Sequence, residues 1–410
     1  MKTKLRYIIA VIVLIKATLA WSTPYYQTLP KNVRLIAVRH VLSSEITNFY
    51  EPTMNSGPLT IKANINTEAL KSIQALDEFY FYKLKKYSPE AYDKFSAGIW
   101  SIDAKAKATV FGIGGAYGFT DRLTGFFALP YYDVKVSLKA NRITGNNYDE
   151  VSDIIRSSGG SLRGLSLETN DLPDPTGELI QSVIVNYYGY QPGGDWEGKG
   201  YGDLELALKY RLTDWKDSGL AISGGAILPT GKVQNEDIIQ DVGFGDGLVG
   251  IYGEFGGGKA FSSLFSINGW VRGQYRFPIT VEKRIPENFD FILSANKGSF
   301  RFIPGVKIES SFSLGFQLTD WINIVPEYLY TYIQASEFKS PYTLANTILG
   351  YKSEEEKHVG KFNFEISSVN TYLKGNIPIP FTAIISVEKT LRGKNTADLT
   401  LGSLEFRLLF

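Results

Sequence analysis

The chain contains many segments in which apolar and polar residues alternate with a period of two. In segment 201–212, one parity carries Leu204, Leu206, Leu208, Tyr210 and Leu212, and the other carries Asp203, Glu205, Ala207, Lys209 and Arg211. Successive side chains of a β-strand point to opposite faces, so this pattern predicts a strand with one apolar and one charged face. The same alternation recurs at 265–277, 306–318, 322–332 and 361–366. The pattern predicts an all-β protein.

The connections between these segments predict a topology. Twelve strands are expected, at 32–47, 104–119, 122–138, 200–213, 218–230, 243–256, 260–277, 304–319, 321–337, 359–374, 379–391 and 397–410. Three tight turns share a Thr-Asp pair, at 119–123, 212–215 and 318–322, and Asp can nucleate a turn by bonding its own backbone. Gly256–Lys259 and Lys374–Asn376 predict two more short turns. An even number of strands with short turns on one side and long loops on the other is typical of a transmembrane antiparallel up-and-down β-barrel of bacterial outer membranes.

Two long connections, 50–103 and 139–199, are expected to be extracellular. Within the first, 66–86 predicts an amphipathic helix, because Asn66 can cap it and apolar residues such as Leu70 and Ile73 recur near helical spacing. This helix could form a lid on the barrel rim or a plug in the lumen. The second connection is rich in Gly, Asn, Asp and Pro, which indicates a surface loop.

Both ends of the chain carry export and assembly features. Residues 1–20 predict a cleaved signal peptide, with a basic start, an apolar run of about nine residues and Thr18-Leu19-Ala20 before the cut. A membrane-spanning helix would need roughly 20 apolar residues. Residues 21–410 would then form a single outer-membrane barrel domain. The last strand alternates through Phe406, Leu408 and the terminal Phe410, which resembles the assembly signal of outer-membrane barrels.

Composition narrows the function classes. The chain has 40 Gly, 25 Tyr and 25 Phe, as expected where glycines let strands bend and aromatic girdles mark the membrane surfaces. It has no Cys, so neither disulfides nor a lipid-anchoring cysteine are expected, and two His make a transition-metal site improbable. Without residues 1–20 the chain has 39 basic and 42 acidic residues, which gives no basic surplus for nucleic acid. No cofactor is expected.

Catalysis has little support in the sequence. Only His40 and His358 could serve as imidazole bases, and no nucleophile motif surrounds either, although Ser43 and Ser44 lie near His40. The glycine clusters 112–115 and 243–247 do not precede a helix in a βαβ unit, so they do not predict a nucleotide site. Asp237, Asp241 and Asp246 lack the spacing of calcium ligands, so the calcium alternative is a minor one.

In each predicted strand, the positions that alternate with the apolar ones should face the barrel lumen, and many of them are charged. The expected solute-path residues are Asp203, Glu205, Lys209, Arg211, Arg272, Arg276, Lys307, Glu309, Glu327, Lys361, Glu365, Glu405 and Arg407. Parity also places Lys105, Lys107 and Glu388 in the lumen. The signs are mixed, so these charges should pair across a narrow lumen rather than form a ring selective for one sign.

Several motifs resemble one family of outer-membrane proteins. They are Gly200–Leu212, Leu228–Gly231 and Gly243–Asp246, preceded by Tyr117–Leu123 and Leu129–Tyr131. Over roughly 105–410 the chain resembles the transporter-like family named for the "MetA-pathway of phenol degradation". The resemblance implies a barrel that passes aromatic compounds.

The expected function is passive uptake of small solutes, among them apolar or aromatic compounds, through the outer membrane of a Gram-negative-type bacterium. Its partners would be outer-membrane lipids, the barrel assembly machinery and the solute. The alternative is a non-conducting structural or surface-interaction barrel, whose lumen is filled by paired charges and the 66–86 helix. An enzyme is the third reading.

Overall fold

The computed structural model describes residues 24–70, 81–157, 176–213, 215, 217–286, 289 and 293–410. The expected signal peptide at 1–20, Asp214 of the second Thr-Asp turn and the middle of the predicted helix, 71–80, lie outside these residues. Among the residues described, no helix has both the length and the apolar character needed to cross a membrane.

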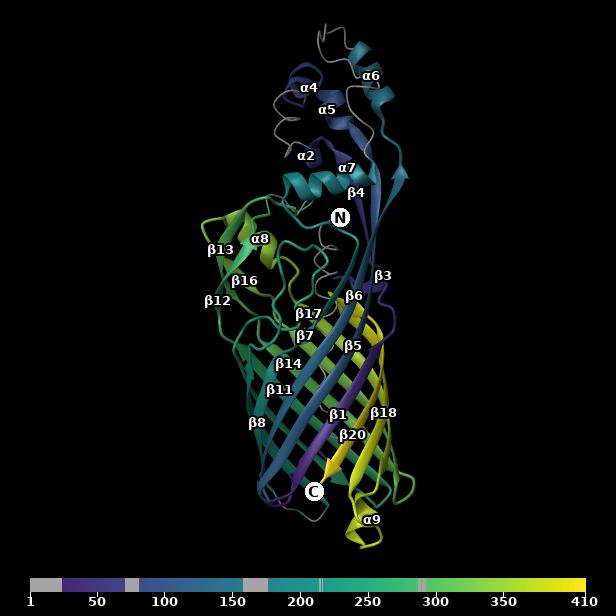
Figure 1. Ribbon diagram of the computed structural model, residues 1–410, viewed down its shortest axis with the longest axis vertical. Coiled ribbons are helices and arrows are strands. Elements are labelled where there is room, and N and C mark those ends of the chain that lie inside the picture. Colours follow the sequence, from purple (N-terminus) through teal and green to yellow (C-terminus); the bar gives the residue numbers. More distant parts are fainter. Residues whose placement is uncertain are drawn as a thin grey trace.

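Twelve antiparallel strands form a closed barrel, which confirms the predicted fold class (Figure 1). They are β1 (Arg34–Ser43), β5 (Ser96–Thr120), β6 (Leu123–Thr144), β8 (Leu204–Arg211), β9 (Ser218–Leu228), β10 (Gly250–Ala260), β11 (Phe265–Arg276), β14 (Lys307–Gln317), β15 (Ile322–Ile333), β17 (Glu355–Ser367), β18 (Phe381–Lys394) and β20 (Thr400–Leu409). Each pairs with the next, and β1 pairs with both β5 and β20, so no barrel edge is left open.

The predicted strands agree with the observed ones in number and order. Their bounds differ, for instance at β5, which begins at Ser96 and not at 104, at β6, which ends at Thr144 and not at 138, and at β10, which begins at Gly250 and not at 243. Three further differences are local. Gly256–Lys259 was expected to be a turn but lies inside β10, and residues 261–264 make the turn instead. The backbone of Gly256 and Gly257 lies so close to neighbouring strands that a Cβ there would come within 2.7 Å of Gly269 and 2.6 Å of Gly219. These glycines therefore permit close packing of strands. The second difference is the 368–380 connection, which contains the short helix α9 (Val369–Leu373) before the expected turn. The third is His358, which belongs to β17 and not to a loop.

We call the end of the barrel that holds the Thr-Asp turns and Phe410 the turn end, and the opposite end the loop end. At the loop end, β5 and β6 continue well beyond the other strands and carry an extension (Figure 1). Its elements are β4 (Thr60–Asn66), β7 (Asp195–Tyr201), α2 (Thr67–Leu70), α4 (Tyr82–Tyr87), α5 (Pro89–Lys94), α6 (Tyr148–Ser157), α7 (Gly177–Ser182) and the π-helix η2 (Val183–Tyr187).

The helices of the extension have their own apolar core. Phe81, Leu84, Phe95 and Val151 are almost fully buried in it. The described parts of the predicted 66–86 helix, α2 and α4, lie in this extension, far from the barrel lumen (Figure 1). The prediction of a helix in the first long loop is confirmed at these two parts.

Two small sheets complete the loop end. One contains β12 (Ile279–Arg284), β13 (Lys297–Ile303) and β16 (Glu337–Lys339), and is covered by α8 (Thr343–Gly350). The other contains β2 (Asn48–Tyr50), β3 (Ser56–Pro58) and β19 (Thr396–Asp398). They extend the barrel wall beyond the ends of their parent strands.

The polarity of the strand faces reverses along β5. Near the turn end its outward residues are apolar, among them Ile113 and Phe111, and its inward residues are small. Towards the loop end Lys105 and Lys107 point outward, while Ala104, Ala106 and Ala108 are buried inside. The expectation that Lys105 and Lys107 face the lumen was therefore wrong, because a strand outside the membrane turns its polar face to water and its apolar face to the protein.

Candidate functional site

The lumen contains a cavity of about 500 Å³. Seven basic and eight acidic side chains line it, together with six serines and nine apolar residues. Because neither sign predominates, the cavity has no strong single-sign potential. A small polar or amphipathic molecule would fit the volume, since ligand sites usually measure about 300–1,000 Å³.

Most of the predicted solute-path residues meet at this cavity. The ones that line it are Glu205, Lys209, Arg272, Arg276, Lys307, Glu309, Glu327, Lys361, Glu365 and Glu405. Asp203, Arg211 and Arg407 do not line it. Asp203 accepts a backbone hydrogen bond from Gly231, Arg211 donates to the carbonyl of Asp121 at the turn end, and Arg407 is buried against Glu405.

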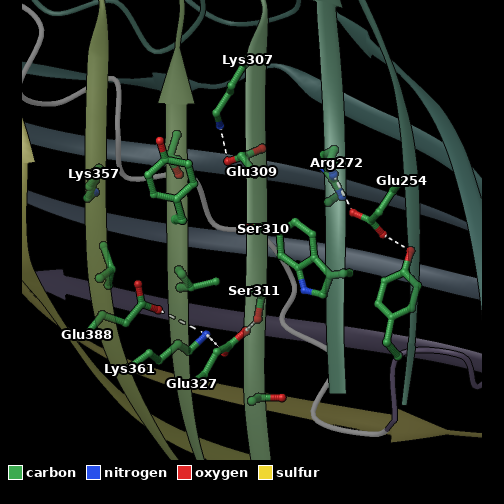
Figure 2. A pocket seen from close by; sticks show the side chains of 18 of the residues that line it. Glu254, Arg272, Lys307, Glu309, Ser310, Ser311, Glu327, Lys357, Lys361 and Glu388 are labelled. Carbon is green, nitrogen blue, oxygen red and sulfur yellow. Dashed lines mark hydrogen bonds and ion pairs between the residues drawn. The ribbon is translucent and has the colours of Figure 1, made fainter. Parts of the chain in front are cut away.

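One half of the lining is a ladder of shared charges on neighbouring strands. Glu388 on β18 lies 3.0 Å from Arg39 on β1. On its other side it lies 3.4 Å from Lys361 on β17 (Figure 2). Lys361 also reaches Glu327 on β15, at 3.7 Å, and Glu327 accepts a 2.6 Å bond from Ser311. Each charge has more than one partner, which offsets the cost of removing it from bulk water.

The ladder continues on β20 and at the loop end of the lumen. Glu405 accepts a 2.6 Å bond from Arg407 and lies 4.0 Å from Arg39. Nearer the loop end, Lys307 is bonded to Glu309 on its own strand (Figure 2). The wall is thus held by ion pairs along several strands.

A second cluster surrounds Arg272 on β11. Its guanidinium donates to Glu254 at 2.7 Å and to Glu205 at 3.3 Å, and it stacks over the Tyr252 ring at 4.0 Å. The Tyr252 hydroxyl donates to Glu205 at 2.5 Å. This cluster joins β8, β10 and β11.

The segment before β1 lies inside the barrel at the turn end. The Tyr25 hydroxyl donates to Glu254 and lies 3.1 Å from the Ser223 hydroxyl, and Lys209 sits 3.8 Å from the centre of its ring. Farther along, the backbone N–H of Leu29 donates to Thr124 at 2.8 Å. All the side chains that receive this segment point inward, so residues 25–29 occupy the turn end of the lumen.

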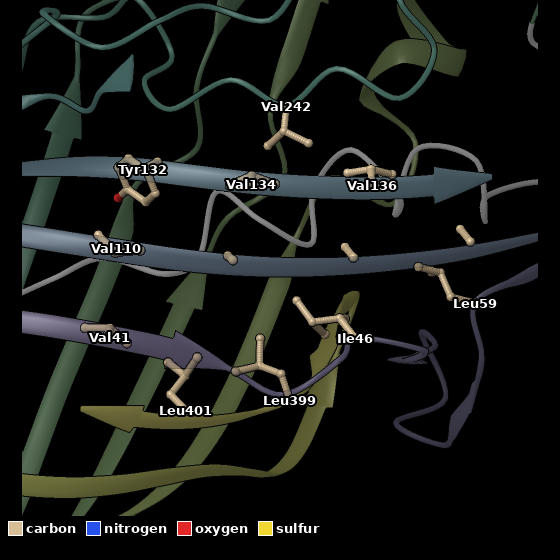
Figure 3. Packing of buried hydrophobic residues seen from close by; sticks show 14 of the residues in the cluster. Val41, Ile46, Leu59, Val110, Tyr132, Val134, Val136, Val242, Leu399 and Leu401 are labelled. Atoms are coloured by element: carbon tan, nitrogen blue, oxygen red, sulfur yellow. The ribbon is translucent and has the colours of Figure 1, made fainter. Parts of the chain in front are cut away.

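On one side of the barrel, the loop end is apolar. Inward residues of β1, β5, β6 and β20 form a buried cluster with residues of the adjoining loops (Figure 3). Its wall includes Val41, Val110, Val134 and Val136. The connection between β9 and β10, residues 229–249, folds onto this wall: Val242 is fully buried there and Phe244 stacks on Tyr132 with ring centres 5.3 Å apart. The cluster has almost no exposed surface, so it fills this side of the barrel.

Motifs that are far apart in the sequence converge where this connection is anchored. The N–H of Gly202 donates to the Pro130 carbonyl at 2.8 Å, and the Thr230 hydroxyl donates to the Gly202 carbonyl at 2.9 Å. The N–H of Gly231 donates to Asp203 at 3.0 Å. We call Pro130, Gly202, Asp203, Thr230 and Gly231 the anchor cluster. Pro130 and Gly202 lie where β7 passes into β8 beside β6, so the cluster ties the 229–249 connection to the barrel wall.

Glycine is required at the centre of the anchor cluster. A Cβ on Gly231 would lie 2.8 Å from the backbone of Gly245, and one on Gly245 would lie 2.3 Å from Asp203. Gly243 is closely packed as well, since a Cβ there would lie 3.0 Å from the backbone nitrogen of Gln234. The sequence did not predict that these motifs meet, because each one by itself indicates only a strand or a turn.

The three aspartates considered for calcium are paired with cations. Asp237 bonds Lys297 and Arg284, both at the loop end. Asp241 is fully buried and accepts a 2.8 Å bond from Lys232, and Asp246 pairs with Arg276. The bonds from Lys297 and Arg284 hold the pKa of Asp237 below its usual range. The three carboxylates therefore act in separate ion pairs.

Both histidines face outward. His40 on β1 stacks on Phe111 with ring centres 4.4 Å apart, and its cross-strand partners are Phe111 and Leu404. His358 lies between the Tyr328 hydroxyl and Glu356. Within the described part of the chain, neither histidine is hydrogen-bonded to a serine. A serine nucleophile beside a histidine, which a Ser-His-acid catalytic site needs, is not among these contacts.

Four charged residues of the cavity lining and Tyr25 were not among the predicted lumen residues. Arg39 lies in the first strand, whose apolar residues alternate poorly, and Glu254 lies next to the glycine run taken for a turn. Glu355 and Lys357 lie in a charged run that was read as a loop. Tyr25 precedes the first strand and carries no periodic signal. Glu355 and Lys357 lie just before the predicted strand 359–374, because β17 begins four residues earlier, whereas Arg39 and Glu254 lie inside predicted strands and are inward by alternation.

The fold has a counterpart among solved structures. An outer membrane channel from Pseudomonas putida F1 is 11% identical and matches with a TM-score of 0.54, covering 94% of this chain and 98% of that one. A FadL homologue from Pseudomonas aeruginosa (7% identical, 92% and 89% covered) and the toluene transporter TbuX of Ralstonia pickettii (8%, 93% and 89%) each give a TM-score of 0.32. The last two values are too low to establish a shared fold.

The sequence comparisons add no family. No protein-family model and no curated protein matches the sequence. The resemblance to the phenol-degradation family therefore stays a prediction, and the first of these structures shows that the chain has the fold of an outer-membrane channel barrel.

Proposed function

We propose that the chain is exported by a signal peptide at 1–20 and works in the outer membrane as a channel for small solutes. The observation that carries this is the closed barrel with a cavity of about 500 Å³ lined by polar and charged groups. The apolar side chains in the cavity lining, such as Phe126, Trp270 and Leu329, favour solutes with apolar or aromatic parts. Passage is by diffusion, and outer-membrane lipids and the barrel assembly machinery are the other partners.

Tyr25 keeps the turn end of this pathway occupied. A hydrogen bond to a carboxylate contributes about 1.5–3 kcal/mol, and 1.4 kcal/mol corresponds to about a factor of ten in a population. Loss of the bond from Tyr25 to Glu254 should therefore raise the open fraction about tenfold or more. Displacement of residues 25–29 from the lumen would connect the cavity to the turn end.

The test is single-channel recording in planar bilayers with the mature chain, Tyr25→Ala and a deletion of 24–31. Both variants should open for longer or conduct more than the unmodified chain. Tyr82→Ala, at an exposed position in α4, is the matched control and should leave the conductance unchanged.

A second candidate is a non-conducting barrel whose lumen is permanently filled. It is favoured by the shared charge ladder together with residues 25–29 in the lumen. If the deletion of 24–31 folds, shown by heat-modifiable migration on gels, and neither it nor the unmodified chain conducts, the channel proposal fails and this candidate replaces it.

A further inference from the structure

The outer surface of β5, β6 and β7 has an abrupt chemical boundary. On β5 the outward residues from the turn end to Phe111 are apolar or aromatic, and on β6 they are so up to Tyr131. Phe111 pairs with Tyr131, and Tyr131 pairs with Tyr201 of β7, so three aromatic side chains form one outward row. Aromatic rows of this kind lie at the level of the lipid headgroups.

Strand length supports this position for the membrane surface. A tilted transmembrane strand needs about 9–11 residues. Phe119 to Thr109 on β5, and Leu123 to Asp133 on β6, are each eleven residues counted from the turn end. The next outward residues are Lys107 on β5 and Lys135 on β6, which places both ammonium groups at the headgroup level.

Lys107 and Lys135 are directly opposite each other in the register of the two strands. Both are exposed and on the outward face. Like charges at directly opposed positions destabilise a sheet. Among the described residues, no carboxylate bonds Lys107, whereas Lys135 lies 3.6 Å from Glu197. An anion between the two ammonium groups would remove the repulsion.

The neighbouring charges leave room for such an anion. Lys199 on β7 is bonded to Glu197 at 2.7 Å and to Asp133 at 3.1 Å. Lys105, one outward position above Lys107, pairs with Glu45 at 3.1 Å. Of these four lysines, Lys107 alone has no carboxylate partner among the described residues.

We propose that Lys107 and Lys135, with Lys199 at their side, bind the phosphate group of a phosphorylated lipid in the outer leaflet. A phosphate carries −1.5 to −2 charges and accepts several charge-assisted hydrogen bonds, so one group can bridge both lysines. The aromatic row from Phe111 to Tyr201 would contact the upper acyl chains of the same lipid. The site selects lipid over soluble phosphate because it lies directly above that row.

The experiment measures retained lipid. The mature chain is placed in phosphatidylcholine nanodiscs with increasing amounts of diphosphorylated lipid A, and bound lipid is counted by native mass spectrometry. The double variant Lys107→Gln/Lys135→Gln should need about tenfold more lipid A, or more, for the same occupancy. Lys259→Gln is the control, because Lys259 is an exposed lysine near Phe261 at the turn end, and it should behave like the unmodified chain.

The comparison arms decide between sources of the phosphate. Dephosphorylated lipid A should not be retained, and soluble inorganic phosphate should not compete at millimolar concentration. Equal retention by the double variant and the unmodified chain overturns the proposal, and so does equal retention of the dephosphorylated lipid. Competition by soluble phosphate would identify the site as one for an adventitious ion only.

A single variant keeps the proposal testable if the double variant does not fold. Lys107→Gln removes the like-charge pair, so without phosphorylated lipid its midpoint of thermal unfolding should equal or exceed that of the unmodified chain. With lipid A, the unmodified chain should gain more thermal stability than this variant. A lower midpoint without lipid A would contradict the repulsion on which the proposal depends. Neither measurement depends on whether the lumen conducts.

Discussion

The two halves of β5 and β6 have opposite polarity. In the half near the turn end, outward residues such as Ile113 and Phe127 are apolar and exposed. In the half near the loop end, outward residues such as Lys107 and Lys135 are charged, and the inward ones, such as Ala106 and Val136, are buried in an apolar core. The strand geometry is continuous across the change. The difference shows that the strand backbone sets the two-residue period of the alternation. The surroundings of each face, lipid, water or protein, set whether that face carries the apolar or the polar residues.

The strongest way to break this comparison is to place a charge inside the half near the loop end. Ala106 is 4% exposed and lies opposite Val136. Ala106→Glu should lower the free energy of unfolding by about 3–5 kcal/mol, because the carboxylate would be buried without a partner. Urea unfolding in lipid vesicles measures the effect. Lys107→Gln, next to it but outward, should change the value by about 0.5 kcal/mol or less. Equal stabilities would mean that water reaches the inward face there.

The reverse test places a charge on the outward face of the half near the turn end. Ile113→Lys should cost about 2–4 kcal/mol, because the ammonium group would face hydrocarbon. Ile143→Lys on β6 is the matched control: Ile143 is also outward and exposed but lies beyond the membrane, so about 0.5 kcal/mol or less is expected. Unfolding of both variants in the same vesicles decides the point. A large cost at Ile143 would place the membrane higher than the aromatic row does.

A smaller effect is expected at the turn end, where the chain closes the barrel. The backbone of Phe410 exchanges two hydrogen bonds with Arg34, at 2.8 and 3.0 Å, while its ring is 55% exposed. Phe410→Ser should therefore cost about 1 kcal/mol or less in vesicles. In cells, the same variant should give much less heat-resistant barrel if the ring is read by the assembly machinery. Phe277→Ser, another exposed outward aromatic, should leave the cellular amount unchanged, and an equal loss for both would argue against a terminal signal.

The smallest effect concerns an ion pair on the loop-end side. Bonds from Lys297 and Arg284 lower the pKa of Asp237. A carboxyl with a lowered folded-state pKa stabilises the fold above its unfolded pKa of about 3.9, and this contribution is lost as the pH falls through the folded value. Asp237 is one-third exposed, so the contribution should be below about 1 kcal/mol. Hydrogen exchange of residues 183–190, corrected for the intrinsic effect of pH, should rise between pH 5 and 3.

Asp237→Asn should remove that pH dependence. Arg284 donates to the Tyr188 and Gly189 carbonyls at 2.6 and 2.9 Å, so it transmits the loss to this segment. Exchange in the variant should already be raised at pH 5 and should change little at pH 3. A variant with the same pH response as the unmodified chain would show that another group titrates.

The sequence by itself determined the features that depend on local chemistry. Period-two alternation located the barrel strands, Thr-Asp pairs located the tight turns, and together they gave twelve strands in a closed antiparallel order. Ten of the thirteen predicted solute-path residues line the cavity, because parity within a membrane-embedded strand separates lipid from lumen. These features depend only on residues that are close together in the sequence.

Only the tertiary structure decided the rest. It showed that Lys105 and Lys107 point outward. The alternation of apolar and polar residues does not tell whether lipid or water surrounds a strand, so it could not decide this orientation. It kept Gly256–Lys259 within β10, because the glycines in this segment allow the neighbouring strands to approach closely. It brought Tyr25 to Glu254 across 229 positions of sequence, and Pro130, Gly202 and Thr230 to one anchor cluster. Contacts of this kind depend on how the sheet closes, and closure is a property of all twelve strands at once.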